Sequence, residues 1–367
     1  MRPTLAVIHT PNLKYNFLAI RKKVKKIRVM AVVKADAYGH GMIKCVEALK
    51  SLGDKSPEYY GVALLEEAIE LRKSKITDEP ILSFAPFLLS EINNYKKYKI
   101  IPTVCTAKHI NDLYKLNKRI KIHINIETGM GRLGINFMEA AELISRLTKN
   151  KNIIIDGIYT HFATSDVKNK KFAQLQLQRF NKVLSELKSK NIDYGLAHTA
   201  NSGAILDMPE TWLDMVRVGI SLYGYYPSQE TSESIKLKPV MSLISKVSTV
   251  HYINKGDSVS YGRKFIAKQK TKIATVPIGY ADGFSRGLTN NASAIIKGKT
   301  YPQVGRVSMD RIMFDVGDDK IKVGDKVILL GSSKEKSITA WKWSTVLNTI
   351  PYEIICGISK RVPRVFR

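Results

Sequence analysis

The sequence predicts an α/β fold in which an N-terminal (β/α)8 TIM-like barrel is followed by a mainly antiparallel β domain. From about residue 29 to 220, short apolar runs alternate with helical patterns, and eight such repeats are typical of a closed barrel. Beyond about residue 236, short and often alternating apolar runs are separated by Gly, Asn and Asp, which indicates antiparallel strands. We therefore place the barrel in residues 1–236 and the β domain in residues 237–367.

Each predicted barrel strand but the last is followed by a polar turn and a segment with helical spacing. The eight strands are expected at Val29–Val33, Tyr60–Leu64, Pro80–Phe84, Ile100–Val104, Ile120–Ile126, Ile153–Tyr159, Gly195–His198 and Met215–Gly219. The strands of the β domain are expected at Val247–Ile253, Lys272–Ile278, Ala292–Lys297, Gln303–Val307, Arg311–Val316 and Lys326–Leu330, with a late helix over Thr339–Leu347.

The composition favours a cytoplasmic protein with a large core. The chain has 367 residues, of which 44% are hydrophobic, so it can bury enough apolar surface to fold. Its three cysteines are scattered and form no CxxC pair, which argues against a disulfide framework or a metal site. No apolar run reaches the roughly 18 residues that a membrane span needs, and we expect no signal peptide.

The net charge of +27 is the one feature that suggests another class of protein, one that binds nucleic acid or an anionic surface. The basic residues are nevertheless spread along the whole chain, mostly as lysines on predicted outer helix faces. No basic stripe interleaved with aromatic residues is present. A compositional bias toward lysine accounts for this spread, so we expect neither a nucleic-acid nor a membrane partner.

Lys34 stands at the carboxyl end of the first predicted strand, where barrels of this type carry their chemistry. A partly desolvated amine there can act as a nucleophile toward an aldehyde, whereas a lysine that merely extends into solvent is the alternative. Residues 32–41 read VVKADAYGHG. This segment resembles the attachment site of pyridoxal 5'-phosphate in alanine racemases, in which the lysine forms a Schiff base with the cofactor.

Other strand ends deliver polar groups to the same predicted rim. They are Tyr38 after the first strand, Arg132 after the fifth, His161 after the sixth, Ser202 after the seventh, and Arg217 with Gly219 and Ile220 at the eighth. Because the carboxyl ends of parallel strands meet at one end of a barrel, we expect these groups to lie together.

The loop with Gly129, Gly131 and Gly134 matches the GxGxxG dinucleotide-binding fingerprint. Three features weigh against that interpretation. The loop follows the fifth repeat rather than opening a nucleotide domain, the downstream Asp156 lies within a strand, and Arg132 sits inside the loop. The segment instead resembles the arginine loop of alanine racemases, which implies that Arg132 contacts the phenolic oxygen of the cofactor and the carboxylate of the substrate.

The same resemblance implies the remaining cofactor contacts. His161 would pack beside the pyridine ring, and Arg217 would face the pyridine nitrogen. The phosphate would be held by Tyr38, Ser202, Gly219, Ile220 and Tyr352. A guanidinium can only donate hydrogen bonds, so Arg217 would keep this nitrogen unprotonated and the ring a weaker electron sink. That favours simple removal and return of the α-proton, which is racemisation.

Racemisation needs a proton donor or acceptor on each face of the α-carbon. Lys34 would serve one face. Tyr261 lies in a Ser-Tyr-Gly-Arg segment that resembles the one carrying the second base of the family, where it comes from the partner subunit of a homodimer. By the same resemblance, Met309 and Asp310 would border the substrate carboxylate and complete the site of the partner, and Tyr280 would lie at its entrance. Without the resemblance, Tyr261 and Tyr280 would be predicted as core aromatics.

The chain departs from the family pattern at Asn125. Many members have a carbamylated lysine there, whose negative charge orients the arginine of the loop. Asparagine carries no charge. We hypothesise that a bound chloride near Asn125 and Arg132, or the asparagine carbonyl itself, takes over this task.

Together these features predict a pyridoxal-phosphate-dependent racemase that interconverts L- and D-alanine by a two-base mechanism and supplies D-alanine for bacterial cell-wall peptidoglycan. Three alternatives stay open. One is a racemase of the same fold acting on serine, lysine or several amino acids. Another is an amino-acid decarboxylase on the same barrel, against which Arg217 speaks. The third is a basic binding protein that has lost catalysis.

Overall fold

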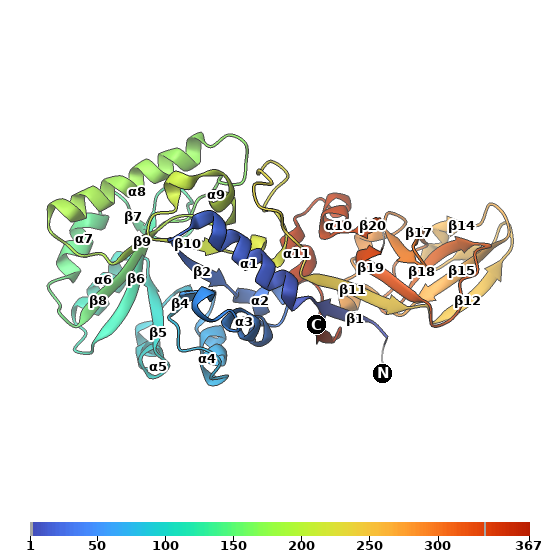
Figure 1. The fold of residues 1–367 in the computed structure, drawn as a ribbon, viewed down its shortest axis with the longest axis horizontal. Helices are drawn as coiled ribbons and strands as arrows, with labels where there is room; N and C mark the ends of the chain where they lie inside the picture. The colour runs from blue at the N-terminus through green and yellow to red at the C-terminus, as the bar shows by residue number, and fades with distance from the viewer. Residues whose placement is uncertain (1–2, 334) are drawn as a thin grey trace. The chain divides into compact units, whose positions relative to one another are not determined.

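The computed structural model describes residues 3–333 and 335–367, and they form two compact units (Figure 1). The barrel unit comprises Leu13–Ala37 and Met42–Lys238. The β unit comprises the segment that ends at Asn12, the short segment Tyr38–Gly41, and Pro239–Arg367. The domain boundary predicted after residue 236 stays a prediction, since the chain crosses between the units more than once.

The barrel unit contains all eight predicted strands, so the predicted fold class is confirmed. They are β2 (Arg28–Val32), β3 (Tyr59–Val62), β4 (Ile81–Pro86), β5 (Ile100–Val104), β6 (Ile120–Glu127), β8 (Ile153–Tyr159), β9 (Leu196–His198) and β10 (Met215–Val218). They are parallel and pair in the order β10-β2-β3-β4-β5-β6-β8-β9. Asp214 N donates to Ala197 O at 3.0 Å and Arg217 N to Ala200 O at 2.9 Å, which nearly closes the barrel between β9 and β10.

Helices connect the strands and surround them (Figure 1). They are α1 (Thr10–Val24), α2 (Lys34–Gly39), α3 (Met42–Lys50), α4 (Leu65–Lys73), α5 (Ile92–Lys97), α6 (Ala107–Tyr114), α7 (Ala140–Leu147), α8 (Lys171–Ser189) and α9 (Ser202–Asp207), with a short β7 (Ile135–Asn136) beside β6. In α8, Phe180, Val183 and Leu187 recur at helical spacing and are all buried. This apolar stripe explains why the segment packs as a helix against the strands.

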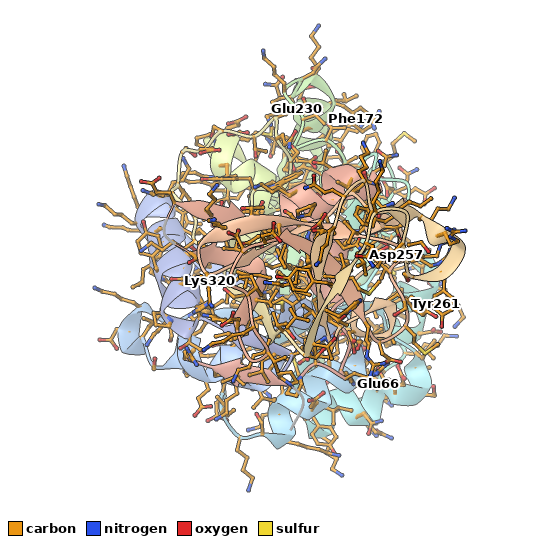
Figure 2. All side chains as sticks on the ribbon, turned by 90° about the vertical axis from the view of Figure 1, so that its right-hand side faces the viewer. Glu66, Phe172, Glu230, Asp257, Tyr261 and Lys320 are labelled. Atoms are coloured by element: carbon orange, nitrogen blue, oxygen red, sulfur yellow. The ribbon has the colours of Figure 1, made fainter. Side chains whose placement is uncertain are left out.

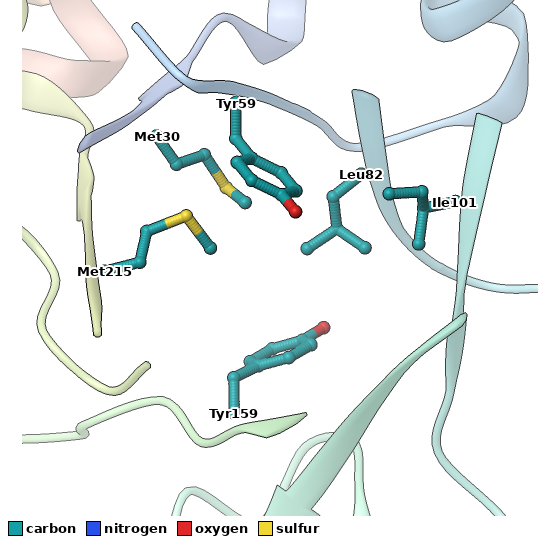
Figure 3. Close-up of a cluster of buried hydrophobic side chains, with 6 residues drawn as sticks. All are labelled: Met30, Tyr59, Leu82, Ile101, Tyr159 and Met215. Atoms are coloured by element: carbon teal, nitrogen blue, oxygen red, sulfur yellow. The ribbon is translucent and has the colours of Figure 1, made fainter. Parts of the chain in front are cut away.

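The inside of the barrel is a packed core. Met30, Tyr59, Leu82, Ile101, Tyr159 and Met215 form one buried cluster contributed by six different strands (Figure 3). Burying a side chain of this size contributes about 1.5–3 kcal/mol relative to its exposure. The space between the strands is therefore filled by side chains, and polar groups that carry chemistry are left to the rim.

The β unit is built on a large, mainly antiparallel sheet. Its path consists of β12 (Thr249–Ile253), β15 (Thr271–Val276), β18 (Ile312–Gly317), β17 (Lys299–Val304), β16 (Ser293–Ile296), β19 (Lys326–Ser333), β11 (Met241–Lys246), β1 (Leu5–Ile8) and β21 (Arg364–Phe366), with β20 (Lys336–Ile338) beside β19. A separate hairpin pairs β13 (Ser258–Val259) with β14 (Phe265–Ile266), and two helices follow, α10 (Ala340–Leu347) and α11 (Pro351–Cys356).

Two sequence expectations for these strands need correction. The run expected at Gln303–Val307 is instead the end of β17, which begins at Lys299 because it pairs in a hairpin with β16. The N-terminal strand β1 was not predicted. It lies beside β11, to which it is antiparallel (Figure 1). On its other side it pairs in parallel with β21. A run of four apolar residues has too little local pattern to predict that it pairs with strands more than 230 residues away.

No helix within residues 3–333 and 335–367 combines the length and the apolar character needed to cross a membrane.

Candidate active site

Lys34 begins α2 directly after the end of β2, and its side chain is half-buried. The residues that follow, from Ala35 to Tyr38, all have φ between 52° and 54°, so this short helix is left-handed. Such a conformation costs roughly 1–2 kcal/mol for each residue with a Cβ. Neighbouring groups hold it in place, because Ala35 N donates to Glu67 Oε1 at 2.6 Å and Met42 N to Asp36 Oδ1 at 2.7 Å. The segment directly after Lys34 is therefore strained, and its conformation is determined by its surroundings.

The arginine loop after β6 is organised around Glu127. The carboxylate of Glu127 accepts hydrogen bonds from the backbone N–H groups of Gly129, of Gly131 at 2.9 Å and of Arg132 at 3.3 Å. A Cβ at Gly134, whose φ is +131°, would come within 2.5 Å of the backbone nitrogen of Glu127. The glycines of the GxGxxG pattern thus serve a tight loop around a carboxylate of this chain, which leaves the motif without its nucleotide-binding role.

Asn125 holds the other side of this loop. It is buried in β6, and its Nδ2 donates to the carbonyl of Leu133 at 3.3 Å. The loop is also joined to the strand end beside it, because the hydroxyls of Thr128 and Thr160 lie 2.7 Å apart. The backbone of Arg132 is therefore anchored on both sides by uncharged contacts and one carboxylate.

Arg217 is the most completely coordinated side chain at the rim. It is 3% exposed and donates to the carbonyls of His198 at 2.9 Å, Thr160 at 2.7 Å and Thr199 at 2.9 Å. Its two terminal nitrogens also lie 2.8 Å from His198 Nδ1 and 3.4 Å from His161 Nδ1. Burial lowers the pKa of Arg217 to about 10, so the guanidinium stays charged at neutral pH.

His161 brings the barrel part of the site together. Burial and, in decreasing order, the positive charges of Arg217, Arg132 and Lys34 together lower the pKa of His161 to about 3. These charges come from three different strand ends, and all three act on the imidazole of His161, which itself follows a fourth strand. His161 is neutral at pH 7.

Ser202 and the backbone after β10 form a second group of polar atoms. Ser202 is 5% exposed, and its hydroxyl accepts from Gly219 N at 3.0 Å and from Ser221 N at 3.4 Å. A 3-10 turn, η4 (Ile220–Tyr223), follows directly. The Ser221 hydroxyl is buried and has no hydrogen-bond partner within the described part of the chain. Hydroxyl and amide donors of this kind suit an anion such as a phosphate, and Ser221 is a member of this set that the sequence reasoning missed.

The β unit holds the other predicted site residues. Tyr38 and Tyr352 lie side by side with ring centroids 6.1 Å apart, and burial raises the pKa of Tyr38 well above its ordinary value. Tyr280 and Met309 lie on two loops joined by backbone hydrogen bonds, of Tyr280 N to Ser308 O at 3.1 Å and of Ala281 N to Met309 O at 3.2 Å.

Tyr261 and Tyr280 are not core residues. Tyr261 lies in the turn η5 (Tyr261–Arg263) and is labelled in Figure 2. It is 71% exposed, and Tyr280 is 42% exposed. Met309 is 51% exposed, and the exposed Asp310 accepts from Arg361 at 2.6 Å. The core role that residue type alone predicts for the two tyrosines is therefore wrong, because neither of them packs into the apolar interior of the β unit.

Comparison with known proteins decides the family. The N-terminal domain of alanine racemase matches residues 8–227, and its C-terminal domain matches residues 240–366. The chain belongs to the alanine racemase family. The family assignment made from the VVKADAYGHG segment and the arginine loop is thereby confirmed.

Relatives of the family match over the full chain. Alanine racemase 2 of Caldanaerobacter subterraneus is 41% identical over 373 residues, covering 100% of this chain and 95% of its own. The alanine racemase of Clostridium tetani is 44% identical over 376 residues, with 100% and 96% covered. Among solved structures, the alanine racemase of Clostridium difficile 630 superimposes with a TM-score of 0.93 at 37% identity, covering 100% of this chain and 96% of that one. The Bacillus anthracis alanine racemase with bound L-Ala-P has a TM-score of 0.92 at 35% identity, with 100% and 95% covered.

Proposed function

We propose that this member of the alanine racemase family is a pyridoxal-phosphate-dependent alanine racemase that interconverts L- and D-alanine. The observation that carries the proposal is the buried Arg217, held by three backbone carbonyls at the same rim as Lys34 and His161. The relatives named above are alanine racemases, which favours this reaction over a serine or lysine racemase, a decarboxylase or a binding protein without catalysis.

The residues of the barrel rim fit pyridoxal 5'-phosphate. An aldehyde needs an amine, which Lys34 supplies, and a phosphate needs donors, which the Ser202 hydroxyl, the buried Ser221 hydroxyl and the backbone around Gly219 supply. By family resemblance Tyr38, Ile220 and Tyr352 would contact the phosphate too. When bound, the cofactor would accept the electrons that are released as the α-hydrogen leaves the substrate.

Arg217 would limit what the cofactor can do. A guanidinium offers N–H donors and no acceptor, so any ring nitrogen that faces it must be unprotonated. The contacts of Arg217 with His198, Thr160 and Thr199 hold it in this orientation. His161, neutral at working pH, would pack beside the ring without adding a second charge. The site would thus support removal and return of the α-proton and would disfavour reactions that need a stronger electron sink.

Lys34 and Tyr261 would act as the two bases. Lys34 would remove or return the proton on one face of the α-carbon, and the partner subunit's Tyr261 would do so on the other. The 71% exposure of Tyr261 supports this, because a side chain that its own unit leaves uncovered is available to a second copy of the chain. Met309 and Asp310 would border the substrate carboxylate and Tyr280 the entrance, from the same partner, with Arg132 gripping the carboxylate from the barrel side.

We further propose that a chloride near Asn125 contributes to the positioning of Arg132. The amide nitrogen of Asn125 donates to Leu133 O, and its side chain supplies no negative charge where a carbamate would supply one. The reaction would take place in the cytoplasm, and its D-alanine would enter cell-wall peptidoglycan.

The deciding experiment is an assay of D-alanine formed from L-alanine, by chiral separation, with and without added pyridoxal phosphate. L-serine and L-lysine run in parallel. Lys34→Ala should abolish the product, whereas Lys44→Ala, which changes an exposed lysine paired with Glu47, should leave it unchanged. Conversion of serine or lysine at a higher rate than alanine would contradict the substrate assignment, and product from Lys34→Ala would contradict the mechanism.

A further inference from the structure

A row of polar side chains leads away from Arg217 through the strands of the barrel, and all of its members but the partly exposed Asp156 are buried. His198 Nδ1 lies 2.8 Å from Arg217, and its other ring nitrogen, Nε2, lies 3.0 Å from His123 Nδ1. His123 Nε2 in turn lies 3.4 Å from Asp156 Oδ2. Arg217, His198, His123 and Asp156 stand on β10, β9, β6 and β8, respectively. The row therefore runs from the predicted site residue Arg217 to the carboxylate of Asp156, which contacts none of the predicted site residues.

The two ends of the row determine where every proton lies. The guanidinium of Arg217 only donates, so His198 Nδ1 must accept and its proton must be on Nε2. That proton points at His123 Nδ1, which must therefore also be an acceptor, and so the proton of His123 is on Nε2. The carboxylate of Asp156 can only accept. It lies 3.4 Å from His123 Nε2, which makes no direct hydrogen bond to any described residue, and at this distance its negative charge favours a proton on that nitrogen. Each ring is in the Nε2–H form, and the arrangement is consistent from one end to the other.

Burial keeps the two rings neutral and in place. His123 and His198 are both 0% exposed, and burial lowers the pKa of each below its ordinary value. The ring of Tyr159 stacks on His198 with centroids 5.0 Å apart and an interplanar angle of 18°. A Cβ on Gly157 would come within 2.6 Å of the His123 ring, so this ring packs directly on the backbone. Rotation of either ring would need displacement of its neighbours.

Asp156 stays ionised at the far end. Burial by itself raises the pKa of this carboxyl, but the contacts from His123, Lys121 and Tyr59 outweigh burial and hold the pKa well below its usual range. Lys121 Nζ lies 2.7 Å from Oδ1, and the Tyr59 hydroxyl lies 2.9 Å from Oδ2. The carboxylate therefore remains an acceptor throughout the neutral range.

We propose that Asp156 is a positioning residue for the reaction, which acts through His123 and His198 to keep an acceptor, rather than an N–H group, in front of Arg217. Without the carboxylate, His123 can take the opposite tautomer, and His198 then presents an N–H group to the donor-only guanidinium. Two facing donors repel each other, and Arg217 shifts from its place. This inference rests on the proposed role of Arg217 toward the cofactor.

Nitrogen NMR of histidine-labelled protein tests the tautomers directly and needs neither substrate nor turnover. In the unaltered protein we expect His123 and His198 to carry their proton on Nε2, and in Asp156→Ala we expect Nδ1–H forms to appear in both. Asp207→Ala is the matched control, because Asp207 is similarly buried and paired with Lys170 but contacts no histidine. Unchanged tautomers in Asp156→Ala, or Nδ1–H forms in the unaltered protein, would overturn the proposal.

Kinetics then separate positioning from folding. For Asp156→Ala we expect kcat for L-alanine to fall roughly 10- to 100-fold with a nearly unchanged KM, as for other residues that orient a catalytic group from behind. Asp156→Glu, which keeps the acceptor, should recover part of the loss. If Asp156→Ala does not fold, Asp156→Asn is measured in the same way, since an amide nitrogen can donate to His123 and favour the reversed tautomer. A protein without racemase activity would still give the NMR result, so failure of the proposed function and failure of this inference are distinguishable.

Discussion

Two predicted site residues of the barrel unit and two of the β unit are held in opposite ways. Arg217 and Ser202 of the barrel are 3% and 5% exposed and are surrounded by hydrogen-bond partners from their own unit. Tyr261 and Met309 of the β unit are 71% and 51% exposed. The barrel unit therefore orients Arg217 and Ser202 itself, whereas the packing of the β unit leaves Tyr261 and Met309 uncovered. Substitutions of the first pair should affect stability as well as activity, and substitutions of the second pair should affect activity alone.

The largest expected effect is that of Tyr261→Phe. Loss of the hydroxyl should lower kcat by roughly 10²- to 10⁴-fold, the range for removal of a general acid–base. The melting temperature should not change, because the side chain is mostly exposed. Kinetics and thermal melting check both statements. A clear fall in the melting temperature would show that the Tyr261 hydroxyl contributes to the stability of the β unit.

Mixing two inactive variants tests whether Tyr261 acts in the site of the partner subunit. If each site combines Lys34 of one subunit with the partner subunit's Tyr261, a mixed dimer of Lys34→Ala and Tyr261→Phe contains one intact site. Random exchange of equal amounts should then restore about one quarter of the wild-type activity, since half of the dimers are mixed. No recovery after verified subunit exchange would place both bases within one chain.

Arg217→Gln should combine a loss of activity with a loss of stability. The variant loses the fixed positive charge, which we expect to cost roughly 100-fold in kcat. It also leaves some of the carbonyls of His198, Thr199 and Thr160 without a donor, and each buried polar group left unsatisfied costs about 1–3 kcal/mol. Urea unfolding and steady-state kinetics measure the two effects. If the variant loses activity but keeps its full stability, the buried contacts of Arg217 do not contribute to the stability of the barrel unit.

Glu127→Gln should act on substrate binding. The amide has one acceptor oxygen in place of the carboxylate that collects the N–H groups of Gly129, Gly131 and Arg132. A charge-assisted hydrogen bond contributes about 1.5–3 kcal/mol, so disorder of the loop should raise KM for alanine by roughly tenfold with a smaller change in kcat. Glu142→Gln, at an exposed position of α7, is the control and should leave KM unaltered.

Acid should destabilise the protein through its buried imidazoles. The folded pKa of His161 is about 3, which is below its ordinary value of 6.5. The unfolded chain therefore binds a proton that the folded chain refuses, so the stability from this group is complete above pH 6.5 and declines as the pH falls toward 3. One such group changes the free energy of unfolding by at most about 1.4 kcal/mol per pH unit. Urea unfolding of His161→Gln should show a weaker dependence on pH in this window, and an identical slope would contradict a neutral His161.

Exchange of chloride for a large organic anion should have the smallest effect. If chloride helps to position Arg132 beside Asn125, its removal at constant ionic strength should raise KM for alanine about two- to fivefold, the effect of a contact worth somewhat less than 1.4 kcal/mol. Steady-state kinetics in the two salts measure it. An unchanged KM would mean that the loop contacts of Asn125 and Glu127 position Arg132 without chloride.

Much of the fold could be predicted from the sequence, and the misses have physical causes. The barrel strands are continuous apolar runs because helices cover one side and the packed core the other, which makes them visible in the sequence. The left-handed turn after Lys34 was not predicted, since Ala35, Ala37 and Tyr38 have no intrinsic preference for it. Strand β1 was missed because its pairing partners, β11 and β21, are distant in the chain.

The sequence alone was enough to predict the eight barrel strands, the strand ends at which Lys34, Arg132, His161 and Arg217 stand, and the family. The tertiary structure alone decided how those groups are held. His123, His198 and Asp156 lie on three different strands, and only the register between these strands brings their polar atoms within 3.0 Å and 3.4 Å of one another. Local patterns along a chain specify which face of a strand is buried, whereas distances between side chains on different strands arise only once the sheet has closed.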